Sequence, residues 1–331
     1  MPHDALETGP GRLPPAKTRR ITGTVTALSV TVASILTLTK LVAFLYSGSV
    51  AMLASLADSG LDLAASLIAF FAVRYASSPA DEDHRYGHGK AEALASLVQA
   101  MLVALSAGLL LREAITRFLE PSPVTASGLA LGVMGLSIAL TIGLVWAQTE
   151  ALKRTQSLAV SGDRAHYFSD LGANVAVIVA LILSGSFGIY QADPLIGAAI
   201  ALWLFWTAFG VGKSAYENLM DAELPDEDRQ RIADLVGADD AVLGVHQLRT
   251  RASGPFVHIQ MHLDLDPDLS LRDSHTIVVA AERRVMEAYP AADVLIHPDP
   301  AGEAEPHGNR YFTHGSEHDS EPDCEPTGET R

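Results

Sequence analysis

The chain has 331 residues, of which 48% are hydrophobic, and it carries a formal net charge of -16. Apolar and acidic residues in such numbers must occupy separate parts of the chain. The acidic balance argues against nucleic acid as a partner. The single cysteine, Cys324, excludes a disulfide framework and a thiolate metal cluster, so any bound metal must be held by histidine and carboxylate side chains.

After a polar N-terminal segment, residues 1–20, the chain contains long apolar stretches. A transmembrane helix needs about 20 mostly apolar residues. The segments that satisfy this are 21–46, 49–74, 91–117, 124–150, 165–187 and 193–214. The first is too long for the apolar core of a signal peptide and lacks a convincing cleavage site. We therefore predict an α-helical membrane domain with six transmembrane helices over residues 21–216, embedded in a lipid bilayer.

Basic residues predict how these helices cross the membrane, because cytoplasmic loops are enriched in Lys and Arg. They precede the first span and fill the connections after the second and fourth spans: Lys17, Arg19, Arg20, Arg85, Lys90, Lys153, Arg154 and Arg164. Arg112 and Arg117, near the end of the third span, weaken this bias. We expect both termini to be cytoplasmic.

Residues 217–300 have the pattern of a small soluble domain. A helix is predicted after Pro225, a strand over 242–251, and a half-buried strand over 257–266, where apolar and polar residues alternate. Ser270 begins a second amphipathic helix that runs to about residue 289, and 293–297 forms a closing strand. This order predicts a ferredoxin-like αββαβ domain. The acidic tail, residues 301–331, has few apolar residues and is predicted to be disordered.

Two pairs of ionisable residues lie inside predicted membrane helices. Asp58 and Asp62 are four residues apart in the second span, and His166 and Asp170 repeat this spacing in the fifth, so each pair shares one helix face. Ionisable residues in membrane helices are energetically unfavourable and usually functional. Interhelical hydrogen bonding is the alternative, but it does not require two repelling carboxylates on one turn. Three carboxylates and one imidazole suit a tetrahedral site for a divalent ion such as Zn²⁺.

Two further groups could bind metal. One is Asp81, His84 and His88, in the polar loop after the second span. The other consists of soluble-domain residues: His246, His262, His275, His297 and Asp299. For both groups, spacing alone leaves open that the side chains are simply solvated.

Other features argue against competing functions. Gly212-Lys213-Ser214 resembles the end of a phosphate-binding loop, but Thr207 occupies the position at which that motif requires its first glycine. We therefore expect no bound nucleotide. Lys40, in the first span, is expected to be paired or to snorkel to the interface. The tail histidines His307, His314 and His318 are expected to be solvated.

Together, the DxxxD and HxxxD helices, the loop 81–90 and the histidine-bearing C-terminal domain resemble the cation diffusion facilitator family, in particular its bacterial zinc and iron exporters. The resemblance covers about residues 20–300. It implies a homodimer in the bacterial inner (plasma) membrane that exchanges metal for protons. The transport site would be Asp58, Asp62, His166 and Asp170. The other two groups would be a loop site and a two-metal cytoplasmic site that binds regulatory Zn²⁺. Lys90 and Asp221 match a charged pair that helps hold the membrane halves of the family's dimers together.

Several alternatives remain at this point. The transported ion could be Fe²⁺, Cd²⁺, Co²⁺ or Mn²⁺ instead of Zn²⁺. A membrane metal sensor without transport would need the same ligands. An intramembrane metalloenzyme would need an open metal position with a positioned base or nucleophile. No catalytic residues are expected. The N-terminal segment and His258 have no assigned role.

Overall fold

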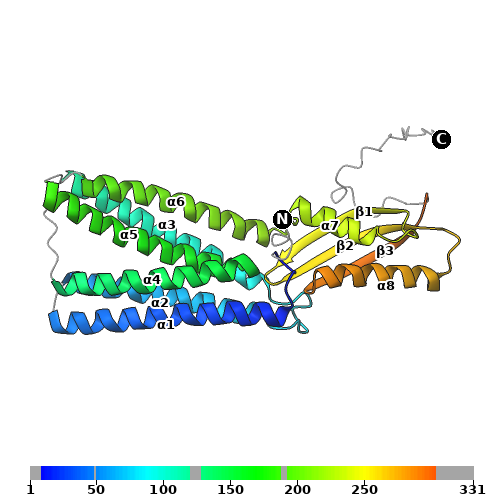
Figure 1. Ribbon diagram of the computed structural model, residues 1–331, viewed down its shortest axis with the longest axis horizontal. Helices are drawn as coiled ribbons and strands as arrows, with labels where there is room; N and C mark the ends of the chain where they lie inside the picture. Colours follow the sequence, from blue (N-terminus) through cyan, green and yellow to red (C-terminus); the bar gives the residue numbers. More distant parts are fainter. Residues whose placement is uncertain (1–8, 48–49, 120–127, 188–191, 303–331) are drawn as a thin grey trace, which may run out of the picture.

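The computed structural model describes residues 9–47, 50–119, 128–187 and 192–302. The chain forms an elongated molecule, with a bundle of long helices at one end and a small α/β domain at the other (Figure 1). The described helices of the bundle are α1 (Pro15–Ser47), α2 (Val50–Ala76), α3 (Lys90–Leu119), α4 (Gly128–Thr155), α5 (Leu158–Phe187) and α6 (Ala192–Leu219). This confirms the predicted six-helix bundle.

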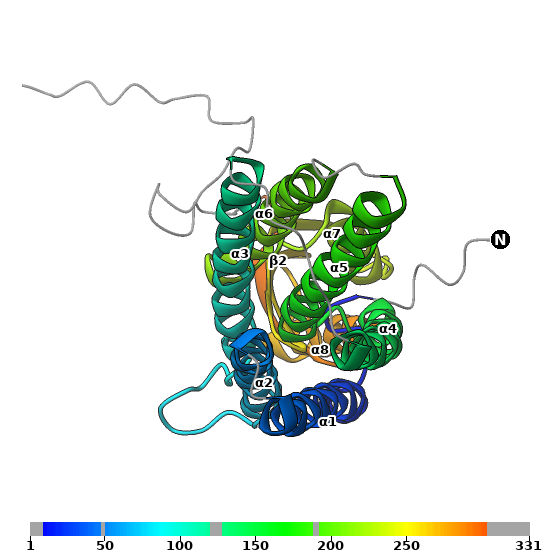
Figure 2. The same cartoon turned by 90° about the vertical axis from the view of Figure 1, so that its left-hand side faces the viewer.

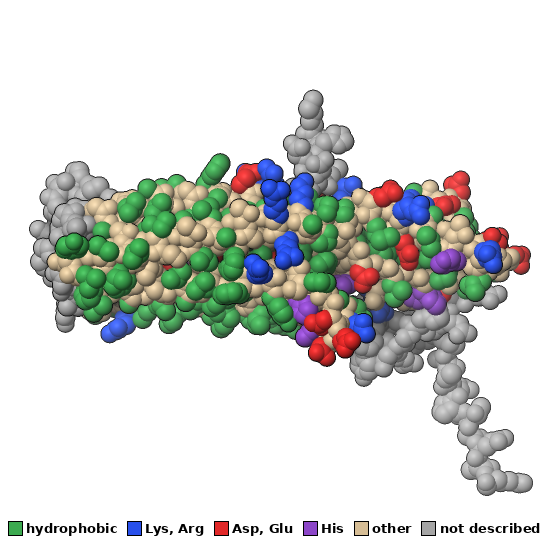
Figure 3. Space-filling model, turned by 90° about the horizontal axis from the view of Figure 1, so that it is seen from below, with side chains coloured by type: hydrophobic (Ala, Val, Ile, Leu, Met, Phe, Trp, Pro, Cys, Tyr) green, Lys and Arg blue, Asp and Glu red, His purple; other side chains and the backbone are tan. Residues whose placement is uncertain are grey.

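Composition supports the assignment of these helices to a membrane. Within the described residues, α1, α2, α3, α4 and α6 each contain a stretch long and apolar enough to cross one. The space-filling view shows hydrophobic side chains over the helical half, with acidic, basic and histidine side chains on the α/β half and at the junction (Figure 3). Viewed along the bundle, α3 lies beside α6, and α1 lies beside α2 and α4 (Figure 2).

Helix boundaries differ from the prediction mainly at the end nearest the α/β domain. The first helix begins at Pro15 instead of residue 21, the fifth at Leu158 instead of residue 165, and the sixth ends at Leu219 instead of residue 214. Hydropathy marks only the stretch that lies in hydrocarbon, whereas a helix can continue into water through pairs such as Lys213 and Glu217. The domain boundaries predicted at residues 20 and 216 therefore both fall inside helices.

The α/β domain contains α7 (Asp226–Val236), β1 (Gly244–Ser253), β2 (Phe256–Leu265), α8 (Leu271–Ala288) and β3 (Ala292–Pro300), in the predicted order. The sheet order is β1-β2-β3, with β2 antiparallel to β1 and parallel to β3. The Ser270 side chain accepts a hydrogen bond from the backbone N–H of Asp273, which caps α8 as expected.

Both helices of this domain cover the same face of the sheet. In the buried core of the domain, apolar side chains of the two helices pack against those of the central strand. They are Ile232 and Val236 of α7, Val278, Ala281 and Val285 of α8, and Val257, Ile259, Met261 and Leu263 of β2. Because side chains alternate along a strand, the intervening residues of β2 face the other side of the sheet. His262 is among them, so its side chain is presented away from the core of the domain.

The first described residues pack on the α/β domain. The Gly11 carbonyl accepts a hydrogen bond from the Ala291 backbone N–H at 3.1 Å. Arg12 forms an ion pair with Asp228 and lies over the Tyr289 ring. This segment leads directly into α1, so it joins the two parts of the molecule. The acidic tail was predicted to be disordered over residues 301–331. Residues 301 and 302 form a turn, and residues 303–331, including the tail histidines, lie outside the described residues.

Candidate metal sites

The first cluster lies within the helical bundle, where α2 faces α5. Asp62, His166 and Asp170 each offer a ligand atom, and these atoms lie within 4.8 Å of one another. His166 Nε2 is 3.0 Å from Asp62 Oδ1. His166 Nδ1 and Asp170 Oδ2 are buried without a hydrogen-bond partner among the described residues. Buried polar atoms are normally satisfied, so these two atoms point to a ligand.

Asp58 does not belong to this compact group. It is exposed, and it lines a cavity of about 100 Å³ together with Asp62 and Asp170. Ser55 and Asn174 also line this cavity, and along α2 and α5 they lie beyond Asp62 and Asp170 in the direction away from the α/β domain. The structure therefore gathers three of the four predicted ligands and places the fourth on the wall of the same cavity.

A buried polar layer closes the cluster on the side facing the α/β domain. Gln148 Nε2 donates to Asp163 Oδ2 at 2.8 Å, and Ser66 Oγ donates to Asp163 Oδ1 at 3.3 Å. Ser66 Oγ also lies 2.7 Å from Tyr167 Oη. All four side chains are almost completely buried. Asp163 was missed because the fifth helix was predicted to start at residue 165. A carboxylate one turn before His166 was the signal that could have identified it.

The second cluster is the loop between α2 and α3. His84 Nδ1 lies 3.2 Å from Asp81 Oδ1, and His88 Nε2 lies 3.1 Å from Asp81 Oδ2. The backbone N–H of His84 donates to Asp81 Oδ1 at 2.7 Å, and this bond, aided by the two imidazoles, holds the pKa of Asp81 below its usual value. His88 is buried against the Tyr75 ring, which orients it. The predicted loop residues therefore converge, with ligand atoms within 4.8 Å.

The third cluster lies on the sheet face opposite the core. Strand register pairs His246 with His262 and His262 with His297, which places one histidine on each strand in a row. The buried Asp299 carboxylate lies 2.8 Å from His262 Nδ1, 3.4 Å from His246 Nε2 and 3.2 Å from His297 Nε2. Three of the four predicted histidines therefore meet around the fifth predicted residue, Asp299.

Two residues differ from the prediction for this third cluster. Asp264 was missed, although its Oδ1 lies 3.2 Å from His246 Nε2, and its position two residues after His262 on the same strand face was a usable signal. His275 is exposed on α8, and the structure gives it no contact with the cluster. Its role as a ligand therefore stays a prediction.

The predicted charged pair is present within one chain. Lys90 Nζ lies 2.6 Å from Asp221 Oδ1, and Arg251 Nη1 lies 3.2 Å from Asp221 Oδ2. Partial burial acts to raise the pKa of Asp221, but the hydrogen bonds and charges of Lys90 and Arg251 outweigh it, so the pKa lies below its usual value. The pair joins the start of α3 to the connection that follows α6.

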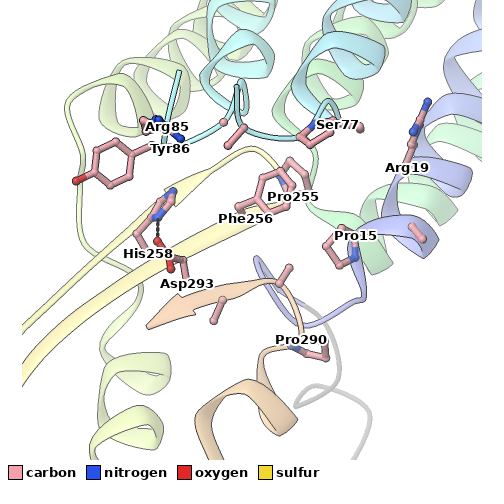
Figure 4. A pocket seen from close by; sticks show the side chains of 16 residues that line it. Pro15, Arg19, Ser77, Arg85, Tyr86, Pro255, Phe256, His258, Pro290 and Asp293 are labelled. Atoms are coloured by element: carbon pink, nitrogen blue, oxygen red, sulfur yellow. Dashed lines mark hydrogen bonds and ion pairs between the residues drawn. The ribbon is translucent and has the colours of Figure 1, made fainter. Parts of the chain in front are cut away.

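His258 lies apart from the three clusters. Its Nδ1 is 3.2 Å from Asp293 Oδ2, and its ring meets that of Tyr86 edge to face. Figure 4 shows it on the wall of a pocket between the loop, the start of α1 and the tip of the β1–β2 hairpin. His258 therefore lies at the junction between the two parts of the molecule, with its Nε2 buried and without a hydrogen-bond partner among the described residues.

The structure also shows where Lys40 and the glycine-lysine-serine segment, residues 212–214, lie. Lys40 is paired, because its Nζ lies 2.5 Å from Ser59 Oγ. Residues 212–214 lie inside α6, where the backbone is helical instead of forming a phosphate-binding loop.

Comparison with known proteins covers nearly the whole described chain. Residues 26–220 match the cation efflux transmembrane domain, and residues 224–301 match the cation efflux protein cytoplasmic domain. The cation-efflux pump FieF of Shewanella oneidensis is 48% identical over 272 residues, which is 82% of this chain and 92% of that protein. The FieF pumps of Cronobacter sakazakii and Salmonella schwarzengrund are 42% and 40% identical, over 81% and 84% of this chain and 89% and 93% of their own lengths.

Proposed function

Because the chain belongs to the cation efflux family, as its motifs predicted, we propose that it exports divalent transition-metal ions, Zn²⁺ foremost, from the cytoplasm in exchange for protons. One observation carries the proposal: Asp62, His166 and Asp170 converge inside the membrane helices, and His166 Nδ1 and Asp170 Oδ2 are buried without a hydrogen-bond partner among the described residues. Asp58, on the wall of the same cavity, supplies the fourth ligand when the helices shift.

The chemistry of this donor set supports exchange with protons. A carboxylate or imidazole that ligates a metal must be deprotonated, so metal and protons compete for the same atoms. Histidine changes its protonation in the pH range of living cells, and His166 therefore suits this competition. Proton uptake by the ligands would release the metal, and metal binding would release the protons.

Access to the cluster supports a direction of transport. The buried layer of Asp163, Ser66, Gln148 and Tyr167 closes it toward the α/β domain, whereas the cavity extends from Asp58 toward the opposite end of the bundle. Basic residues favour placing the α/β domain in the cytoplasm of a bacterial inner membrane, with both termini on that side. The arrangement then corresponds to the release state, and metal would load after this layer opens and the cavity closes.

The two outer clusters suit regulation. The loop cluster lies near the junction and the third cluster lies in the α/β domain, so neither is inside the bundle. Each combines imidazole with carboxylate groups. We propose that cytoplasmic Zn²⁺ binds there and stabilises a homodimer of the chain. His275, exposed on α8, would complete the third cluster only after a rearrangement or from a second copy.

The test uses purified protein in lipid vesicles with an acidic interior and external Zn²⁺. Wild-type protein should drive Zn²⁺ uptake that depends on the pH gradient, whereas Asp62→Ala and His166→Ala should transport at the background rate. Wild-type protein that binds Zn²⁺ but moves none would overturn transport and favour a sensor. Undiminished flux in either variant would overturn the assigned site.

Competition among metals in the same vesicles determines the substrate. We expect Zn²⁺ to be taken up in preference to Mn²⁺, because one nitrogen ligand among oxygens shifts a site toward borderline ions. Preferential uptake of Fe²⁺, Cd²⁺ or Co²⁺ would keep the mechanism and change the substrate.

A further inference from the structure

Lys40 is a buried basic residue at the proposed transport site. It comes from α1, its side chain lines the same cavity as Asp58, Asp62 and Asp170, and only 9% of its surface is exposed. Its Nζ lies 2.5 Å from the hydroxyl of Ser59, which stands next to Asp58 in α2. An ammonium group held inside a site for cations calls for an explanation, because it repels the ion that the site must bind.

The charges around the cavity provide one. Among the described residues that line it, the charged side chains are Lys40, Asp58, Asp62 and Asp170. With His166 neutral, three negative charges and one positive charge leave two negative charges, which one divalent cation neutralises. Without Lys40, a divalent cation would leave one negative charge uncompensated in a region of low dielectric.

We propose that Lys40 is a fixed counter-charge that matches the transport site to a divalent ion and weakens its hold on that ion, so that the metal can leave. This inference rests on the proposed function and adds a specificity residue to it. The ammonium lies on the cavity side of the cluster, where the metal would depart. There the positive charge of the ammonium lies near the same carboxylates as the metal ion and weakens their attraction for that ion.

The first experiment measures initial rates of Zn²⁺ uptake in the vesicles for Lys40→Met, which keeps a long side chain but removes the charge. We expect both KM and the maximal rate to fall by at least about tenfold, because one repulsive charge near a divalent ion is lost. Lys40→Arg retains the charge and should not show the drop in KM. A fall in the maximal rate with unchanged or higher KM in Lys40→Met would overturn the proposal and indicate a packing role.

A second experiment uses charge compensation. Asp58→Asn alone leaves one net negative charge, so a divalent ion binds with excess positive charge and KM should rise. Adding Lys40→Met restores two negative charges, and the double variant should have a KM at least about tenfold below that of Asp58→Asn. If the bond from Lys40 to Ser59 merely fastens α1 to α2, the double variant should be no better than the single one, which would overturn the proposal.

Failure of this inference can be separated from failure of the proposed function. If wild-type protein shows no Zn²⁺ flux, the proposed function fails and the role of Lys40 falls with it. If wild-type protein transports and Asp62→Ala does not, but Lys40→Met and the double variant behave as packing variants, only the counter-charge role is refuted. Should Lys40→Met fail to fold, Lys40→Gln, alone and with Asp58→Asn, provides the same comparison.

Discussion

Replacing Arg12 with alanine should detach the N-terminal segment from the α/β domain. The Arg12 guanidinium pairs with Asp228 and lies 4.1 Å above the centre of the Tyr289 ring. Its side chain is 6% exposed and that of Asp228 is 18% exposed, so the pair is largely shielded from water. Next to it, the Gly11 carbonyl accepts the Ala291 N–H. Arg12 therefore anchors the segment before α1 to Asp228 of α7 and to Tyr289, which directly follows α8.

The magnitude follows from these contacts. Removing one partner of a buried ion pair costs about 3–5 kcal/mol. The Tyr289 hydroxyl still donates to Asp228 Oδ1 at 2.8 Å, which favours the lower end of that range. Burial and the hydrogen bond to Asp228 raise the pKa of Tyr289, so the hydroxyl remains a donor at neutral pH. A loss of about 3 kcal/mol corresponds to a roughly 100-fold increase in local opening.

Hydrogen–deuterium exchange of the full chain, read by mass spectrometry, measures this opening. In Arg12→Ala, the peptide containing the Ala291 amide should exchange about 100-fold faster when exchange follows the opening equilibrium. Peptides from β1 should not change, and they serve as the internal control. Arg12→Lys keeps the charge but loses the planar guanidinium, so the exchange rate of its Ala291 peptide should lie between those of wild type and Arg12→Ala. Unchanged exchange at Ala291 in Arg12→Ala would refute the anchor.

Three further predictions concern the outer sites and the junction. Gly89→Ala should loosen the loop, because a Cβ at Gly89 would lie 1.9 Å from the Ser253 carbonyl oxygen, and loop peptides should then exchange faster than in wild type. Asp221→Asn should lower the melting temperature at pH 7. The pKa of Asp221 is depressed in the folded state, so the ionised carboxylate contributes fully to folding stability above about pH 4, and this contribution is lost as the pH falls through the lowered pKa. A drop in melting temperature at pH 2 as large as that at pH 7 would contradict this. Zn²⁺ at 100 times its dissociation constant should stabilise the α/β domain by about 2.7 kcal/mol in thermal unfolding, and His262→Ala should abolish that gain while Asp240→Asn, an exposed carboxylate, should not.

Local patterns in the sequence predicted the elements and the pairs of site residues. Apolar stretches of sufficient length mark the membrane helices because hydrocarbon requires them, and spacing of four residues puts Asp58 with Asp62, and His166 with Asp170, on shared faces. Alternation in β2 likewise predicted that His262 faces away from the core. These properties are set by neighbours within one or two turns of the chain, so a single sequence is enough to determine them.

Which faces meet was decided only by tertiary packing. The gathering of Asp62 with His166 and Asp170, and the position of Asp58 on the cavity wall, depend on how α2 lies against α5. The row of histidines depends on strand register, and the place of Lys40 depends on α1 packing along α2. Contacts between residues a hundred positions apart leave no local periodicity in the sequence. The motifs and the family resemblance predicted that the two pairs form one site, but only the folded chain shows which of their atoms meet.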